Sequence, residues 1–102
     1  MDFTDTFKDN EAMHQYELLI DGKSSWIEYI KTDSEIYLTH TEVAKELEGN
    51  GIGKEMIAKA LTDIKNKKLK LVPLCPFVAS YIRSNKQFCL ITSEVKALPE
   101  GN

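Results

Sequence analysis

The chain has 102 residues, of which 42% are hydrophobic and 28% are charged, and its formal net charge is −3. This length and composition are typical of one small globular domain with a single core. The acidic balance argues against nucleic-acid binding, which favours basic surfaces, and is compatible with a cationic or amine partner. Because the sequence has no apolar run of membrane-spanning length, we expect no membrane association.

The amino terminus and the cysteines indicate the cellular compartment of the protein and whether it binds a metal. Residues 1–5 have neither the basic nor the apolar segment of a secretory signal, so we expect a cytoplasmic protein. The two cysteines should then be free thiols. They are also too few for a zinc site and wrongly spaced, with His14 and His40 far apart in the sequence, so no metal is expected.

The first half of the chain alternates as antiparallel strands do. Residues 1–11 are polar and predict either a frayed end or a partial edge strand. Three further strands are predicted at residues 14–20, 25–31 and 35–43. Asp21-Gly22 is a strong two-residue hairpin turn, and residues 32–34 form the second turn. We place Ile36, Leu38 and His40 on one face of the third of these strands, within an antiparallel meander.

The second half predicts a helix, a strand and another helix. A long helix is expected over residues 51–67, because apolar residues recur there at spacings of three and four. The apolar segment 70–72 should pair in parallel with the meander through a right-handed crossover. Pro73 and Pro76 should end that pairing, and a second helix is expected over residues 77–85. Residues 88–91 predict a last short strand before a polar tail.

The segment Glu48-Gly49-Asn50-Gly51-Ile52-Gly53-Lys54 separates the meander from the long helix. Glycine tolerates positive φ and lets a ligand approach the backbone. The first amides of the following helix lack intrahelical partners and carry partial positive charge, so such a corner binds phosphate oxygens. From these residues alone, a glycine-rich turn that only caps the helix is equally compatible. Glu48 and Glu55 exclude a Walker A loop, and the third glycine of a dinucleotide fingerprint is missing.

A gap is expected where the two parallel strands diverge at the prolines. Backbone groups left unpaired there are available to a ligand, and ligands favour the carboxyl ends of strands at such points. His40 lies near the end of one strand, and Cys75 lies just past the end of the other. We therefore expect both side chains to face this gap.

Three motifs occur in a distinctive order along the chain, namely Thr39-His40-Thr41-Glu42-Val43, then Glu48 to Lys54, then Val72-Pro73-Leu74-Cys75-Pro76-Phe77-Val78 with Tyr81-Ile82. In this combination the chain resembles the GNAT acyl-CoA N-acetyltransferase superfamily, and more closely its minimal single-domain YjdJ-type branch, from about residue 14 to 88. The resemblance implies an α/β fold with a mixed sheet, in which an antiparallel meander precedes a β-α-β-α unit with splayed parallel strands. It also implies one domain over residues 1–102, with a core of about 14–91 and flexible termini.

The same resemblance implies acetyl-CoA as the co-substrate and an amine as the acceptor. The diphosphate would rest on backbone amides of the glycine segment, which are those of Gly49, Asn50, Gly51, Ile52, Gly53 and Lys54. The pantetheine arm would pair with the preceding strand end at Thr41, Glu42 and Val43. The Gln or Arg that the superfamily usually has two residues before its Gly-x-Gly is not matched here, where Glu48 or Gly49 occupies that position. Residues that would form an additional first strand and paired early helices are also missing, so we expect an open acceptor groove.

Acetyl transfer needs a polarised thioester carbonyl, a base for the amine and a proton for the departing thiolate. His40 is the candidate base, because histidine exchanges protons near neutral pH. Cys75 is the candidate acid, or a nucleophile that carries the acetyl group. By composition alone, Cys75 would be a buried packing residue and His40 a strand or surface residue.

The sequence thus favours an acyl-CoA-dependent N-acetyltransferase, with a monomer expected for a chain of this size. The alternative is a non-catalytic acyl-CoA-binding or protein-interaction module on the same fold. It is motivated by the missing acceptor-covering elements and by the departure at Glu48.

Overall fold

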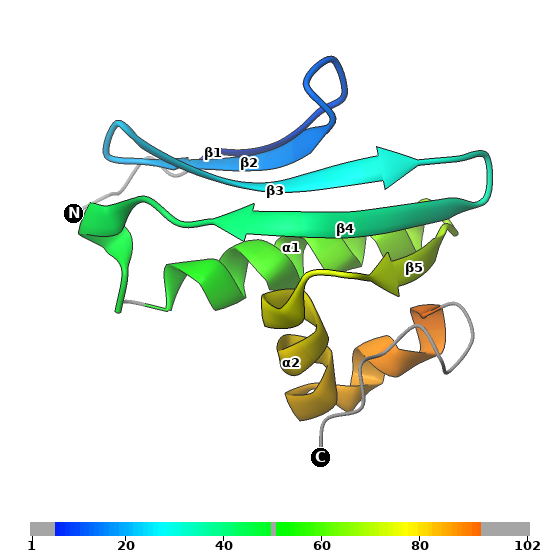
Figure 1. Ribbon diagram of the computed structural model, residues 1–102. Helices are drawn as coiled ribbons and strands as arrows, with labels where there is room; N and C mark the ends of the chain where they lie inside the picture. The colour runs from blue at the N-terminus through cyan, green and yellow to red at the C-terminus, as the bar shows by residue number, and fades with distance from the viewer. Residues whose placement is uncertain (1–5, 50, 93–102) are drawn as a thin grey trace.

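In the computed structural model, which describes residues 6–49 and 51–92, the strands form one five-stranded sheet in the order β1-β2-β3-β4-β5 (Figure 1). Neighbours from β1 to β4 pair antiparallel, whereas β4 and β5 pair in parallel. The strand bounds are β1 Thr6–Asn10, β2 Gln15–Ile20, β3 Lys23–Lys31, β4 Glu35–Glu42 and β5 Lys70–Pro73. The mixed α/β architecture expected from the sequence is confirmed, and so is the partial edge strand near the amino terminus.

The helical elements follow β4 and β5. They are the short 3-10 helix η1 Lys45–Leu47, the long helix α1 Ile52–Asn66, the helix α2 Pro76–Ser84 and the 3-10 helix η2 Lys86–Ile91. Helix α1 runs along the sheet, whereas α2 extends from the end of β5 at an angle to it (Figure 1). The parallel β4-α1-β5 crossover is therefore confirmed. None of the helices in the described ranges is long and apolar enough to span a bilayer.

The predicted strand at residues 88–91 is wrong, because this segment forms most of η2. The carboxyl end of α2 is followed directly by turn hydrogen bonds, from Asn85 N–H to the Ile82 carbonyl and from Phe88 N–H to the Asn85 carbonyl. The ring of Phe88 packs against Tyr81 with centroids 6.1 Å apart. The pattern of a short apolar run does not distinguish a strand from a helical turn. In this segment, local turn hydrogen bonds and packing against α2 favour the helical turn.

The core lies between α1 and the sheet. The apolar stripe of α1 is fully buried at Met56, Ile57, Ala60, Leu61 and Ile64, as its spacing predicted. It packs with alternate side chains of β2, β3 and β4, which include Tyr16, Leu18, Ile27, Ile36 and Leu38. Each strand therefore has one face toward α1 and one face away from it, and this distinction determines which side chains reach the candidate site.

A β-bulge changes the alternation of side chains along β4. Leu38 is opposite Tyr29 and His40 is opposite Glu28, so Thr39 is an extra residue without a partner on β3. A bulge shifts every following side chain to the other face. His40 consequently does not share the face of Ile36 and Leu38, and the expectation that it would is wrong. Thr41, which is opposite the buried Ile27, takes the place on the α1 side.

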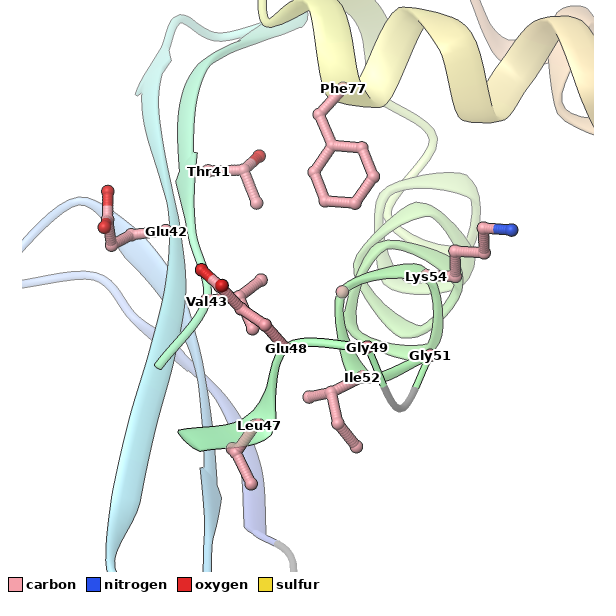
Figure 2. A pocket seen from close by; sticks show the side chains of 11 residues that line it. Thr41, Glu42, Val43, Leu47, Glu48, Gly49, Gly51, Ile52, Lys54 and Phe77 are labelled. Carbon is pink, nitrogen blue, oxygen red and sulfur yellow. The ribbon is translucent and has the colours of Figure 1, made fainter. Parts of the chain in front are cut away.

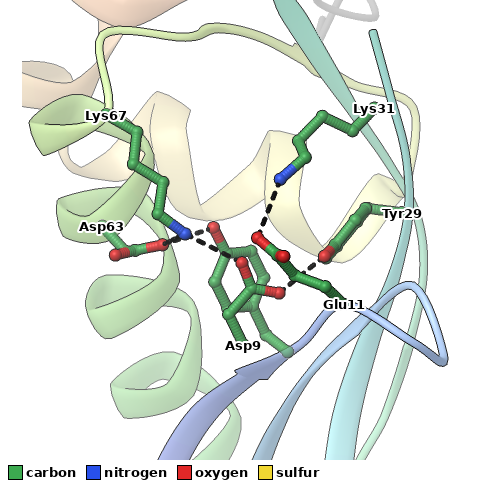
Figure 3. Close-up of polar contacts among 7 residues, drawn as sticks. Asp9, Glu11, Tyr29, Lys31, Asp63 and Lys67 are labelled. Atoms are coloured by element: carbon green, nitrogen blue, oxygen red, sulfur yellow. Dashed lines mark hydrogen bonds and ion pairs between the residues drawn. The ribbon is translucent and has the colours of Figure 1, made fainter.

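A polar network ties the edge strand β1 to the carboxyl end of α1 (Figure 3). Lys67 Nζ lies 2.8 Å from Asp9 Oδ2 and 2.9 Å from Asp63 Oδ2. The hydroxyl of Tyr16 donates to Asp63 at 2.8 Å, and that of Tyr29 donates to Asp9 at 2.6 Å. Since β1, β2, β3 and α1 all contribute, the network fixes this end of the sheet on the helix. The expected flexible termini lie mainly outside the described residues.

Candidate active site

A cavity of about 520 Å³ opens where β4 ends and α1 begins (Figure 2). Its volume is within the range typical of small-molecule sites, about 300–1,000 Å³. It is lined by Thr41, Glu42, Val43, Leu47, Glu48, Gly49, Gly51, Ile52, Gly53, Lys54 and Phe77. One wall is thus the strand end, another is the glycine segment with the first turn of α1, and Phe77 comes from α2.

Eight of the nine residues that the resemblance assigned to the coenzyme line this cavity, and the ninth, Asn50, lies outside the described residues. Leu47 and Phe77 line it as well and were not anticipated. Leu47 lines the cavity because it belongs to the helical turn η1, which bends the chain back toward α1. Phe77 lies two positions after Cys75 in the same proline-flanked motif, and this proximity was the sequence signal for it.

Two glycines in the loop are required by backbone conformation. Gly49 has φ +87° and Gly51 has φ +76°, both in the left-handed region, and a Cβ at either position would meet nothing within 4 Å. Gly51 is the N-cap of α1 and provides no side-chain cap. The first backbone N–H groups of α1 therefore lack an intrahelical acceptor and lie at the positive end of the helix dipole. Together with Lys54, they form a corner suited to an anionic group.

Gly53 is required for a different reason, since its backbone lies within α1. A Cβ at this position would be 2.8 Å from Cε2 and 2.9 Å from Cζ of Phe77, and 3.2 Å from Cγ2 of Val43. The absence of a side chain lets α2 and the end of β4 approach the first turn of α1. The walls of the cavity therefore meet at Gly53.

Cys75 is not among the residues that line the cavity, but it contacts Thr41, which is one of them. Thr41 Oγ1 and Cys75 Sγ lie 3.3 Å apart, and Cys75 is a free thiol that is only 5% exposed. The Cys75 N–H donates to the Leu38 carbonyl at 2.9 Å, just beyond the last pairing of β5 with β4. From there α2 leads the chain away, so β5 provides no ladder partner for Thr41 and Glu42 at the end of β4 or for Val43 just after it. This is the divergence that the two prolines predicted.

His40 does not join Cys75 in the structure. Its Nε2 lies 2.9 Å from Glu42 Oε1, and both side chains are more than half exposed. Figure 2 shows Glu42 on the opposite side of β4 from Thr41 and Phe77. Because His40 and Glu42 are two residues apart on the strand, they share the face of the sheet away from α1. The expectation that His40 and Cys75 face the same gap is therefore wrong, and the bulge at Thr39 is the cause.

The described residues contain no group of three or more His, Cys, Asp or Glu side chains placed to hold a metal ion. The cavity is lined instead by backbone amides, one lysine, the carboxylate of Glu48, the hydroxyl of Thr41 and apolar side chains, and the buried thiol of Cys75 lies behind Thr41. This inventory suits a ligand with an anionic part and a less polar arm.

Comparison with known proteins agrees with the motif order and with the fold. No curated protein matches the chain. Residues 15–90 match the family described as GCN5-related N-acetyl-transferase, which covers the sheet from β2 onward and both α-helices. The chain therefore belongs to the family of GCN5-related N-acetyltransferases.

Proposed function

We propose that this protein is an acyl-CoA-dependent N-acetyltransferase of the minimal YjdJ-type branch, acting as a single domain that transfers an acetyl group from acetyl-CoA to an amine. Membership of the family supports acyl transfer. The observation that carries the proposal is that one cavity is lined both by the open end of β4 and by the amino-terminal turn of α1.

The lining residues fit coenzyme A in three ways. The backbone N–H groups at the start of α1, with Lys54, suit the diphosphate. The segment from Thr41 to Val43, at the end of β4 and just after it, has peptide groups that β5 does not pair, and these suit the amides of the pantetheine arm. Leu47, Ile52 and Phe77 add apolar surface along the arm. The carboxylate of Glu48 opposes an anion, whereas that of Glu42 lies on the other face of β4, so the backbone amides are the main source of affinity.

In the proposed transfer, the thioester carbonyl lies beside Thr41, whose hydroxyl contacts the Cys75 thiol. A backbone N–H at the end of β4 donates to the carbonyl oxygen and stabilises the negative charge that develops there. The amine nitrogen bonds to the carbonyl carbon and gives up a proton, and the carbon–sulfur bond breaks. The Cys75 thiol donates its proton to the departing thiolate and is reprotonated from solvent or from the base.

His40 is the proposed base, and its position defines the side from which the amine must arrive. Because His40 lies on the face of the sheet away from α1, it accepts a proton only from an amine that reaches the thioester from that face. Glu42 accepts a hydrogen bond from one imidazole nitrogen and leaves the other available. No helix of the described residues covers His40, which is exposed to solvent.

A second candidate function is favoured by the same geometry. His40 points away from the cavity that is lined by the residues assigned to coenzyme A. A protein that binds acyl-CoA without transferring the acyl group does not need a base in that cavity, so this orientation of His40 is consistent with a binding module. In that case Cys75 is a packing residue and the His40–Glu42 pair is a surface contact.

Turnover of acetyl-CoA with a panel of primary amines separates the two candidates. We expect His40→Ala and Cys75→Ala each to lower kcat by about a hundredfold, as loss of an acid or base does, with unchanged coenzyme affinity. His14→Ala is the matched control, because His14 is also exposed and should not affect turnover. Tight coenzyme binding without turnover of any amine would favour the binding module. Mass spectrometry after acetyl-CoA alone tests the nucleophile role, which requires an acetyl adduct on Cys75.

A further inference from the structure

A second, smaller cavity lies beside the first, between the start of α1 and one side of α2. Its volume is about 140 Å³, and it is lined by Lys54, Phe77, Ser80, Tyr81, Ser84 and Asn85. Lys54 and Phe77 line both cavities. Lys54 and Phe77 thus lie on the border between a larger and a smaller compartment.

The chemistry of the smaller compartment favours an anion. Ser80 and Ser84 are one turn apart and therefore lie on the same side of α2, and both are exposed at the rim of the cavity. Asn85 donates one amide hydrogen to the Tyr81 carbonyl, at 2.9 Å, and has a second hydrogen to donate. Lys54 contributes the positive charge. None of the described residues that line this cavity is acidic.

The size of the compartment limits what it can bind. A volume of about 140 Å³ is below the range of about 300–1,000 Å³ for whole-ligand sites, and it corresponds to roughly five water molecules. It therefore fits one polar group of a larger ligand whose remainder lies elsewhere. Hydroxyl, amide and ammonium donors in a cavity whose lining includes no acidic residue point to a phosphate monoester.

We infer that this compartment binds the 3′-phosphate of coenzyme A. The inference rests on the proposed function, which puts the coenzyme diphosphate on the other side of Lys54. Coenzyme A carries anionic groups on both sides of its ribose ring, a diphosphate at the 5′ position and a monoester at the 3′ position. Two neighbouring cavities that share a lysine, with amides in one and hydroxyls in the other, match this arrangement.

The test compares coenzyme A with 3′-dephospho-coenzyme A by isothermal titration calorimetry. Wild-type protein should bind coenzyme A about tenfold more tightly, as expected for hydrogen bonds to a charged group. In the Ser80→Ala/Ser84→Ala variant, the affinity for coenzyme A should fall toward that for the dephospho form, which should itself be unchanged. Both serines are exposed, so the variant should fold. Ser24→Ala, at an exposed serine on β3, is the control.

The outcomes separate this inference from the proposed function. Equal wild-type affinities for the two nucleotides would overturn the inference and leave the proposed function standing. A preference for coenzyme A that survives in the double-alanine variant would also overturn it, because the 3′-phosphate would then lie elsewhere. Binding of neither nucleotide would overturn the proposed function, and the inference with it.

Discussion

Gly53 of α1 and Phe77 of α2 are so close that a Cβ on Gly53 would lie 2.8 Å from the ring. Real Cβ atoms do not approach other atoms to that distance. The first turn of α2 therefore packs against the first turn of α1, where Phe77 contacts Gly53. Phe77 is 40% exposed. This contact closes one side of the main cavity and separates it from the smaller one.

Gly53→Ala should have different effects on stability in two backgrounds. In wild-type protein the new methyl group displaces the ring of Phe77, which offsets the gain of about 0.5–1 kcal/mol that alanine brings to a helix. In Phe77→Ala protein the ring is absent, so the same change should stabilise. Urea unfolding of the four proteins should give a coupling energy of about 1 kcal/mol. Additive effects would show that the two residues are not in contact.

Glu48→Gln should strengthen coenzyme binding. The carboxylate of Glu48 lines the main cavity and extends toward Val43 in Figure 2, beside the corner proposed for the diphosphate. Removal of one like charge near the surface should raise the affinity about threefold to tenfold at low salt, and less at high salt. Glu46→Gln, an exposed position in η1, is the control and should have no effect. An unchanged affinity in Glu48→Gln would place the anionic group elsewhere.

Ser25→Ala should destabilise the protein by about 1–2 kcal/mol. Ser25 is fully buried, and its Oγ accepts a hydrogen bond from the Ala44 N–H at 2.9 Å. The variant leaves this N–H without its acceptor, just where the chain leaves β4 for η1. Thermal or urea unfolding measures the loss, and Ser24→Ala, at the exposed neighbouring residue, should cost much less. Similar costs for the two variants would contradict the role of the hydrogen bond.

Stability should fall as the pH rises above 10, because of Tyr16 and Tyr29. Burial raises the pKa of both hydroxyls above the usual 10.0, and their hydrogen bonds to Asp63 and Asp9 raise it further. The unfolded chain therefore loses these protons first, so the stabilisation is present below pH 10 and is lost above it. The slope should approach about 1.4 kcal/mol per pH unit for each tyrosine.

The Tyr16→Phe/Tyr29→Phe variant is the control for this pH dependence. Its unfolding free energy should fall much less steeply above pH 10. The hydrogen bond to Asp9 raises the pKa of Lys67, so a smaller slope of the same sign should remain. Equal slopes for the variant and wild-type protein would show that the two phenols ionise normally in the folded state.

Much of the fold could be predicted because local chemistry and packing agree. Asp21 and Gly22 both have positive φ, +51° and +78°, as the two-residue hairpin turn requires. The stripe from Met56 to Ile64 faces the sheet, as its spacing indicated. The prediction of a strand at residues 88–91 was wrong, because an apolar run this short shows neither the two-residue spacing of a strand nor the three-to-four-residue spacing of a helix.

The candidate site was predictable only in part, because two of its features depend on tertiary geometry. The single unpaired residue Thr39 turns His40 away from Cys75, and no alternation in the sequence marks where such a bulge will form. The approach of Phe77 to Gly53 depends on the docking of α2 onto α1. The loop glycines were found by composition, but the sequence did not reveal that Gly53 is required for close packing whereas Gly49 and Gly51 are required for positive φ.

We propose above all that backbone amides at the start of α1 bind the diphosphate of coenzyme A. It is tested most directly by calorimetric titration of coenzyme A into wild-type protein, Gly51→Val and Gly22→Val. Both glycines have positive φ, +76° and +78°, and both have open space at Cβ, but Gly22 lies in the β2–β3 turn. We predict that Gly51→Val weakens binding at least about tenfold, because strain of about 1–3 kcal/mol reshapes the corner, whereas Gly22→Val binds like wild type. Folded Gly51→Val that binds coenzyme A as tightly as wild-type protein would contradict the account.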